Sequence, residues 1–100
     1  DAVPSLAVTS PNGGESWTRG TSHAIMWSSH SLPGSVRIYL WNGAARTQLA
    51  TNIAMSAGTW TWNIPADQVL GSNYTVQVVS LSYPATYLDT SNGAFSVTVP

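Results

Sequence analysis

Hydrophobic and polar residues alternate along this chain with a period of two, and no segment carries the 3.6-residue stripe of an amphipathic helix. Clusters of Gly, Pro, Asn and Ser interrupt the alternation at short intervals, as expected of turns between strands. The pattern predicts strands at residues 6–9, 22–28, 35–41, 45–52, 59–64, 74–80 and 94–99. We therefore expect an all-β fold, a two-sheet sandwich of the immunoglobulin or fibronectin type with about seven antiparallel strands.

In the segment 35–41, the inward and outward faces of the predicted strand are the easiest to tell apart. Its even positions are all aliphatic, so we place them in the core. Arg37, Tyr39 and Trp41 must then point together out of the sheet. We expect Trp41 in particular to be exposed to solvent.

The dipeptide Asn42-Gly43 is a signal for a two-residue type I′ hairpin turn. A hairpin closed there pairs Trp41 with Ala44, Tyr39 with Arg46, Arg37 with Gln48 and Val36 with Leu49. The strand 74–80 should lie beside this hairpin. The predicted ligand-binding face thus consists of Arg37, Tyr39, Trp41, Arg46, Gln48 and Gln77.

Five tryptophans in 100 residues exceed what one small core holds, so some should lie outside it. Alternation places Trp27 and Trp62 in the core. Trp17, which follows a Gly-Gly turn, is expected to anchor the start of the fold. Tyr74 occupies the place of the corner tyrosine found in many such sandwiches.

A second group of aromatic residues is a separate candidate for ligand binding. Trp60 begins a strand near the rim, and Tyr83 and Tyr87 flank a proline in a long loop expected at 80–92. Exposed aromatic residues on loops often bind ligands, although they also serve simply to fix the loop.

The composition of the chain limits the classes of partner that it is expected to bind. The net charge is −1, with three arginines and no lysine, so the positive field of a nucleic-acid binder is missing. No apolar run approaches the length of a membrane span. The abundance of Ser, Thr, Asn and Gln is typical of secreted modules. We expect residues 1–100 to form one monomeric module of a larger secreted protein, with that protein's neighbouring domains as partners.

The chain has few residues that are suitable for catalysis or metal binding. None of the four acids, which are Asp1, Glu15, Asp67 and Asp89, falls on the predicted face, so a paired-carboxylate glycosidase is not expected. Glu15 should accept hydrogen bonds from the Gly-Gly turn, and Asp89 should cap the turn that follows it. His23 and His30 are too distant for a zinc site. We predict no enzyme activity and no cofactor, with calcium held by Glu15 or Asp89 as the alternative.

Several blocks resemble one family in order: residues 10–17 (SPNGGESW), 20–29 (GTSHAIMWSS), 58–65 (GTWTWNIP), 71–74 (GSNY) and 89–91 (DTS) before Phe95. They are similar to the Ser/Thr-rich GPI-anchored, KRE/KNH-type immunoglobulin-like domain, whose fungal members act in cell-wall β-glucan assembly. Similar modules accompany secreted polysaccharide-active proteins. The resemblance implies an immunoglobulin-like fold. The tryptophans at 41 and 60 depart from the family's usual residues.

These observations favour a non-catalytic carbohydrate-binding module that targets a secreted polysaccharide-degrading enzyme to its substrate. Pyranose rings present apolar C–H faces that stack on Trp and Tyr. The arginines additionally suit an acidic or sulfated polysaccharide, because guanidinium groups bind carboxylates and sulfates through paired hydrogen bonds. The alternative is a structural spacer or cell-surface adhesion domain without a small ligand.

Overall fold

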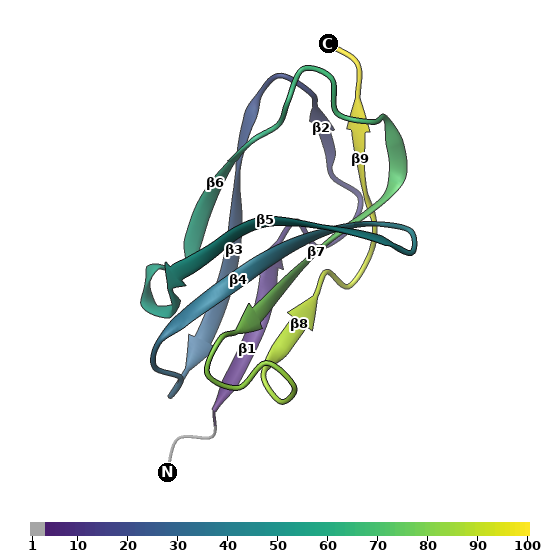
Figure 1. The fold of residues 1–100 in the computed structure, drawn as a ribbon. Coiled ribbons are helices and arrows are strands. Elements are labelled where there is room, and N and C mark those ends of the chain that lie inside the picture. Colours follow the sequence, from purple (N-terminus) through teal and green to yellow (C-terminus); the bar gives the residue numbers. More distant parts are fainter. Residues whose placement is uncertain (1–3) are drawn as a thin grey trace.

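The computed structural model describes residues 4–100, and nearly all of their regular structure is β-strand (Figure 1). The elements are β1 (Ser5–Ser10), β2 (Ser16–Thr18), β3 (Ser22–His30), β4 (Ser35–Asn42), β5 (Ala45–Ala54), the 3₁₀-helix η1 (Met55–Ala57), β6 (Thr59–Asn63), β7 (Gly71–Ser80), β8 (Leu88–Thr90) and β9 (Phe95–Thr98). The prediction of an all-β chain is confirmed.

Two sheets pack face to face (Figure 1). The smaller sheet has the strand order β1-β3-β6. The larger has the order β2-β9-β7-β4-β5, and β8 pairs with the part of β7 that runs beyond β9. Every pairing is antiparallel except that of β2 with β9. This arrangement is an immunoglobulin-like sandwich, as the sequence predicts.

The core lies between the sheets and is rich in aromatic residues. Trp27 and Trp62 are buried in it, as expected, in one cluster with Val76 and Phe95 of the larger sheet. The indole N–H of Trp27 donates a hydrogen bond of 3.0 Å to the carbonyl oxygen of Met55. A buried tryptophan normally needs such a partner, because an unpaired N–H would lose its hydration without compensation.

The first turn is fixed by Trp17 and by Glu15. Trp17 is buried and stacks on the ring of His23, with the two ring centroids 4.5 Å apart. The carboxylate of Glu15 accepts backbone hydrogen bonds of 2.8 Å from Asn12 and Gly13. Both residues therefore have the scaffold roles predicted for them.

The prediction of a corner tyrosine is also confirmed. Tyr74 is buried, and its hydroxyl donates a hydrogen bond to the carbonyl oxygen of Val69. The same hydroxyl accepts a hydrogen bond of 3.1 Å from the side-chain amide of Gln68. These bonds attach the connection between β6 and β7 to the larger sheet.

The predicted register of the β4–β5 hairpin is wrong. Asn42 pairs with Ala45, so the two turn residues are Gly43 and Ala44 rather than Asn42 and Gly43. Gly43 has a φ of 61°, which places the left-handed backbone at the first turn residue, where glycine favours a type II′ turn. Trp41 therefore faces Arg46 instead of Ala44.

The same correction applies along the rest of the hairpin. Tyr39 faces Gln48 instead of Arg46, and Val36 faces Ile53 instead of Leu49. The register is irregular between these pairs, because β5 carries extra residues opposite β4. Near the turn the partner moves by two positions, so the side chains keep the face that alternation predicts.

Two short strands were not predicted. Strand β2 pairs in parallel with β9, and β8 occupies part of what the sequence indicates as a long loop at 80–92. Each has three residues, too few for an alternating pattern to be recognised. Strand β8 extends the larger sheet beside β7.

Candidate functional site

The outer face of the larger sheet carries the side chains predicted from alternation. Along β4 the even-numbered residues Val36, Ile38 and Leu40 are buried, whereas the odd-numbered residues are only partly covered. Strand β4 lies between β5 and β7, so its backbone hydrogen bonds are made on both edges. A central strand is a rigid support for outward-pointing side chains.

Neighbouring strands add further side chains in rows across this face. Tyr39 lies between Gln48 of β5 and Gln77 of β7. Trp41 lies between Arg46 of β5 and Thr75 of β7. Residues directly opposite one another in antiparallel strands have their Cβ atoms within about 5.5 Å, close enough for direct contact.

Arg46 covers the two aromatic rings. Its guanidinium carbon lies 4.1 Å from the centroid of the Tyr39 ring and 5.8 Å from that of Trp41. Both distances are within the range of cation–π attraction, which arises because the ring face carries negative charge density. The stacking surface predicted from the sequence is thus partly occupied by an arginine of the same face.

Arg37 and Trp41 are each held by polar contacts. The Nε of Arg37 donates a hydrogen bond of 3.3 Å to the hydroxyl of Thr51, and one terminal nitrogen donates a bond of 3.2 Å to the hydroxyl of Tyr39. The indole N–H of Trp41 donates to the side-chain oxygen of Gln77 at 3.1 Å. Trp41 is half-buried rather than fully in solvent.

The electrostatic effect of the arginines is visible at Tyr39. The hydrogen bond from Arg37 lowers the pKa of the Tyr39 phenol below its ordinary value of 10.0, and the positive charges of Arg37 and Arg46 act in the same direction. Positive charges that stabilise the phenolate also attract other anions nearby. Arg37 and Arg46 therefore create a positive potential around the Tyr39 hydroxyl.

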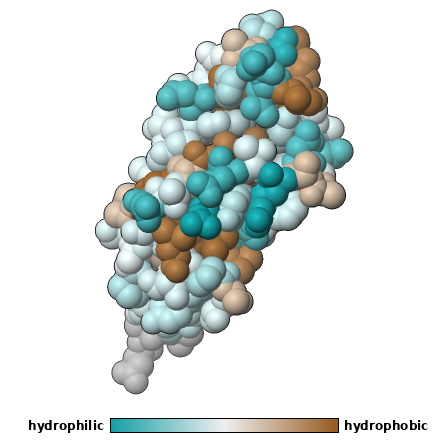
Figure 2. Space-filling model, in the orientation of Figure 1, coloured by the Kyte–Doolittle hydropathy of each residue, from teal (hydrophilic) through white to brown (hydrophobic). Residues whose placement is uncertain are grey.

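A groove of about 480 Å³ runs over this face, and we call it the outer groove. Its lining residues are Arg37, Tyr39, Arg46, Gln77, Val79, Leu81, Pro84 and Leu88. No carboxylate is present among these described lining residues. In the space-filling view, hydrophilic and hydrophobic surface lie next to one another over the middle of the molecule (Figure 2).

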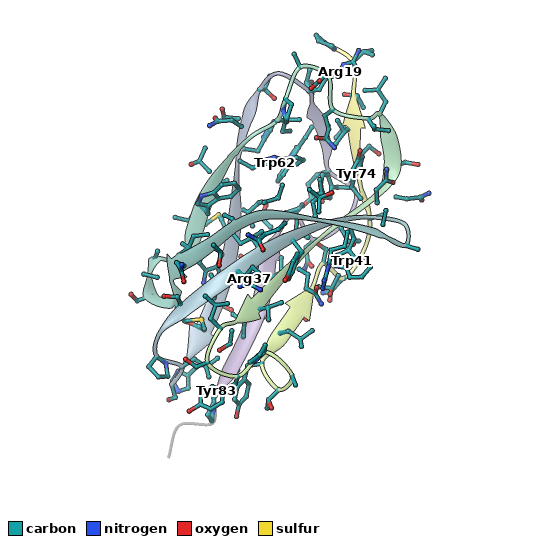
Figure 3. All side chains as sticks on the ribbon, in the orientation of Figure 1. Arg19, Arg37, Trp41, Trp62, Tyr74 and Tyr83 are labelled. Atoms are coloured by element: carbon teal, nitrogen blue, oxygen red, sulfur yellow. The ribbon has the colours of Figure 1, made fainter. Side chains whose placement is uncertain are left out.

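The structure brings together four of the predicted binding residues, namely Arg37, Tyr39, Arg46 and Gln77. Gln48 belongs to the same face as the direct neighbour of Tyr39. Figure 3 shows Arg37 over β4 and Trp41 nearer the hairpin end of the strand.

The second aromatic group is divided between the sheets. Trp60 lies on β6, is half-buried and packs against the core. Tyr83 and Tyr87 lie in the turn between β7 and β8, where their rings meet edge to face with centroids 5.7 Å apart. Tyr83 is 50% exposed and stands at the far end of the molecule from Arg19 (Figure 3).

Sequence reasoning missed the aliphatic part of the outer groove. Alternation along β7 puts Val79 on the same outer face as Gln77, yet Val79 is buried, because Leu88 of β8 lies directly opposite it. Leu81 and Pro84 complete this end of the groove from the turn after β7. Residues 88–90 are too few to show a clear alternation of apolar and polar side chains, so the sequence gives no sign that a strand covers Val79.

The carboxylates of Glu15 and Asp89 have structural partners away from the groove. Asp89 does not cap the following turn as predicted. Its Oδ2 instead accepts a hydrogen bond of 2.8 Å from the backbone N–H of Val8, which joins β8 to β1 across the two sheets. Within residues 4–100, no three His, Cys, Asp or Glu side chains are grouped as potential metal ligands.

A smaller hollow of about 170 Å³ lies beneath the connection from β6 to β7. It is lined mainly by the hairpin end of β4 and β5, by Gln68 and Val69, and by Tyr74. Because Gln68 and Tyr74 already bond to one another, this hollow belongs to the tyrosine corner.

The fold and the positions of the aromatic residues define an immunoglobulin-like domain with a polar outer groove. The chain belongs to the family of Kre9/KNH-like N-terminal Ig-like domains, whose model matches residues 10–97. This confirms the resemblance found in the sequence. Neither the curated proteins nor the solved structures gave a match. In the described part of the chain, no helix is long and apolar enough to cross a membrane.

Proposed function

We propose that this domain is a non-catalytic module that binds acidic or sulfated polysaccharides in the outer groove. The observation that carries the proposal is the lining itself. Two arginines, a tyrosine and a glutamine surround one groove whose described lining holds no carboxylate. Such a surface attracts anions without competing for them with acidic side chains of its own.

Arg37 is prepared for an anion by its existing contacts. Nε and one terminal nitrogen are already engaged with Thr51 and Tyr39. A guanidinium group has five N–H donors, so the remaining donors stay available for a carboxylate or sulfate. Since the group is held by two bonds, less conformational entropy is lost when a ligand binds.

Polar and aromatic groups beside the arginines suit the sugar ring itself. Gln77 can bond a ring hydroxyl with the donors that its amide nitrogen retains, since its oxygen accepts from Trp41. The Tyr39 ring offers an apolar surface for the C–H face of a pyranose once Arg46 moves onto the anionic group. The groove is open, so a polymer can lie along it without being enclosed.

The proposal extends to the biological setting. We propose a secreted location, in which the module acts monomerically, without a cofactor, as part of a longer protein that degrades polysaccharides. Binding through the outer groove would keep that protein's catalytic domain close to its substrate. The composition, poor in charge and rich in Ser, Thr and Asn, supports this setting.

Affinity electrophoresis and titration calorimetry test the binding activity. The isolated domain should be retarded by alginate, polygalacturonate or a sulfated glycan, and less by neutral cellulose or β-glucan. Binding to the anionic polymers should weaken as salt rises, because surface charges are screened beyond about 8 Å at physiological ionic strength. Retardation by no polysaccharide would overturn the proposal.

The chain offers a matched control for charge. Arg37→Gln and Arg46→Gln should each weaken binding to the anionic polymers. Arg19→Gln removes the same charge from one end of the molecule, away from Arg37, where Arg19 donates only a long bond of 3.4 Å to the carbonyl of Gln68 (Figure 3). If all three substitutions weaken binding equally, net charge rather than the outer groove is responsible.

A second candidate function is a structural spacer or adhesion domain. It is favoured by one geometric observation: β1 begins at one end of the molecule, and β9 ends at the other (Figure 1). A domain with this geometry can hold two neighbours apart. The carbohydrate panel separates the two functions, since a pure spacer binds no member of it.

A further inference from the structure

One half of the outer groove is lined by aliphatic side chains, which the proposed binding of anions by the arginines does not explain. Val79 of β7, Leu88 of β8, and Leu81 and Pro84 of the intervening turn form a continuous aliphatic lining. Leu88 is 39% exposed although it lies beside the buried Val79. These four residues come from three consecutive segments of the chain, so the fold gathers them at one place.

The aliphatic half lies directly beside the cationic half. Arg37 is opposite Val79, and Val79 is opposite Leu88, so the three residues form one row across β4, β7 and β8. Neighbouring strands are about 4.8 Å apart, which puts the backbones of Arg37 and Leu88 about 10 Å from one another. A single substituted sugar residue is long enough to reach from the guanidinium group to the leucine.

An unsubstituted acidic sugar fits only half of this surface. Its hydroxyl groups would lose water against Leu88 and Val79 without gaining hydrogen bonds, which is unfavourable. An ester methyl group at the same place would instead remove apolar surface of its own and of Leu88 from water.

Building on the proposed function, we propose that the outer groove selects anionic polysaccharides whose sugars carry apolar acyl esters, such as O-acetyl groups. The acidic group binds Arg37 and Arg46, and the acyl group lies over Val79 and Leu88. The groove then discriminates within the class of acidic polysaccharides by their degree of acylation as well as by their charge.

Polymers that differ only in acylation test this selectivity. We would compare alginate with the same alginate after partial chemical O-acetylation, and native xanthan with xanthan deacetylated by mild alkali. Neither treatment changes the number of carboxylates. Calorimetry at fixed ionic strength should show that at least one acetylated polymer binds about five- to tenfold more tightly than its unacetylated partner, as expected for burial of a methyl group and its contact surface.

Two leucines of similar exposure provide the variant and its control. Leu88→Asn should abolish the preference for the acetylated polymer, so that the affinities for the acetylated and the unacetylated polymer become about equal. Leu70→Asn should leave the preference intact, because Leu70 is 42% exposed but lies outside the groove lining. Leu81→Asn is a second groove variant that does not alter β8, in case the first lowers the melting temperature.

The outcomes separate this inference from the function on which it rests. Equal binding of the acetylated and unacetylated partners would overturn the acyl selectivity and leave the anionic-polysaccharide function standing. Binding of neither alginate nor xanthan in any form would overturn the selectivity. If the other anionic polymers also failed to bind, the proposed function would be overturned with it. A preference that survives both Leu88→Asn and Leu81→Asn would show that the aliphatic lining is not its source.

Discussion

The guanidinium group of Arg46 stacks over the ring of Tyr39, with its central carbon 4.1 Å from the ring centroid. This contact joins β5 to β4 on the outer face of the larger sheet. It also means that a sugar ring and Arg46 compete for the same aromatic surface. A neutral sugar must displace the cation without compensation, whereas an anionic sugar offers Arg46 a new partner.

Replacement of Arg46 should therefore change the preference for ligand charge. In Arg46→Gln we expect affinity for anionic polymers to fall about tenfold or more, since a charge-assisted hydrogen bond is lost. Affinity for a neutral β-glucan should stay the same or rise, because the ring of Tyr39 is uncovered. Calorimetry on both polymers measures the two effects, and an equal loss for both would contradict the competition.

The same substitution should have only a small effect on folding. Exposed cation–π contacts contribute about 0.5–1 kcal/mol each, so loss of the two contacts should lower the free energy of unfolding by about 2 kcal/mol at most. Urea denaturation of Arg46→Gln and Arg19→Gln gives the comparison. A much larger loss in Arg46→Gln would mean that its effect on binding reflects damage to the fold.

Titration of Tyr39 reports on the arginines directly. Its folded pKa is lowered by the hydrogen bond from Arg37 and by the two positive charges, so the phenol should ionise below the ordinary tyrosine pKa of 10.0. The stabilisation linked to this shift is present above the unfolded pKa and is lost as the pH falls through the folded pKa.

The ultraviolet absorbance of the phenolate measures this ionisation. Subtracting the titration of Tyr39→Phe from that of the wild type isolates the one residue among four tyrosines. In Arg37→Gln the midpoint should move up toward 10.0. An unchanged midpoint would show that Arg37 does not hold the phenol.

Glu15 leads to a second prediction about pH dependence, in the acidic range. Partial burial raises its pKa, but the backbone N–H groups of Asn12 and Gly13 outweigh burial, and the net direction is downward from 4.5. A lowered carboxylate pKa contributes stability that is present above the unfolded value and is lost as pH falls through the folded value.

The loss should thus occur below about pH 4.5, where Glu15 becomes protonated. Thermal melts of the wild type at pH 6 and pH 3 should differ more than those of Glu15→Gln. The glutamine cannot titrate and accepts hydrogen bonds through only one oxygen. Parallel melting curves of the two proteins over this pH range would refute the role of Glu15.

Much of the outer face could be predicted because alternation depends only on the parity of the residues. Tyr39 and Arg46 share a face in either hairpin register, since the true and the expected pairings differ by two positions on β5. The spacing of the strands and turns predicted the sandwich, and the family resemblance implied the same fold. The core positions of Trp27 and Trp62 follow from the same reasoning.

What could not be predicted depends on contacts between distant segments. The contact of Arg46 with both aromatic rings requires the correct hairpin register. That register depends on which two residues form the turn. The aliphatic lining requires β8, a strand of three residues held by its pairing with β7 and by Asp89. Local sequence pattern contains no information on such long-range bonds.

The bond between Asp89 and Val8 should accordingly support both stability and binding. Asp89→Ala leaves the backbone N–H of Val8 without its partner, and loss of a hydrogen bond to a charged group costs about 1.5–3 kcal/mol. Asp89→Asn keeps an acceptor oxygen and should cost less.

Because β8 carries Leu88 into the outer groove, Asp89→Ala should also increase amide hydrogen exchange in 88–90 and weaken binding to acetylated alginate. Urea denaturation, exchange measured by mass spectrometry and calorimetry test the three effects together. If Asp89→Ala lowered stability but left exchange in 88–90 and binding unchanged, β8 would be held by β7 alone, and the bond from Asp89 would serve only to position β1.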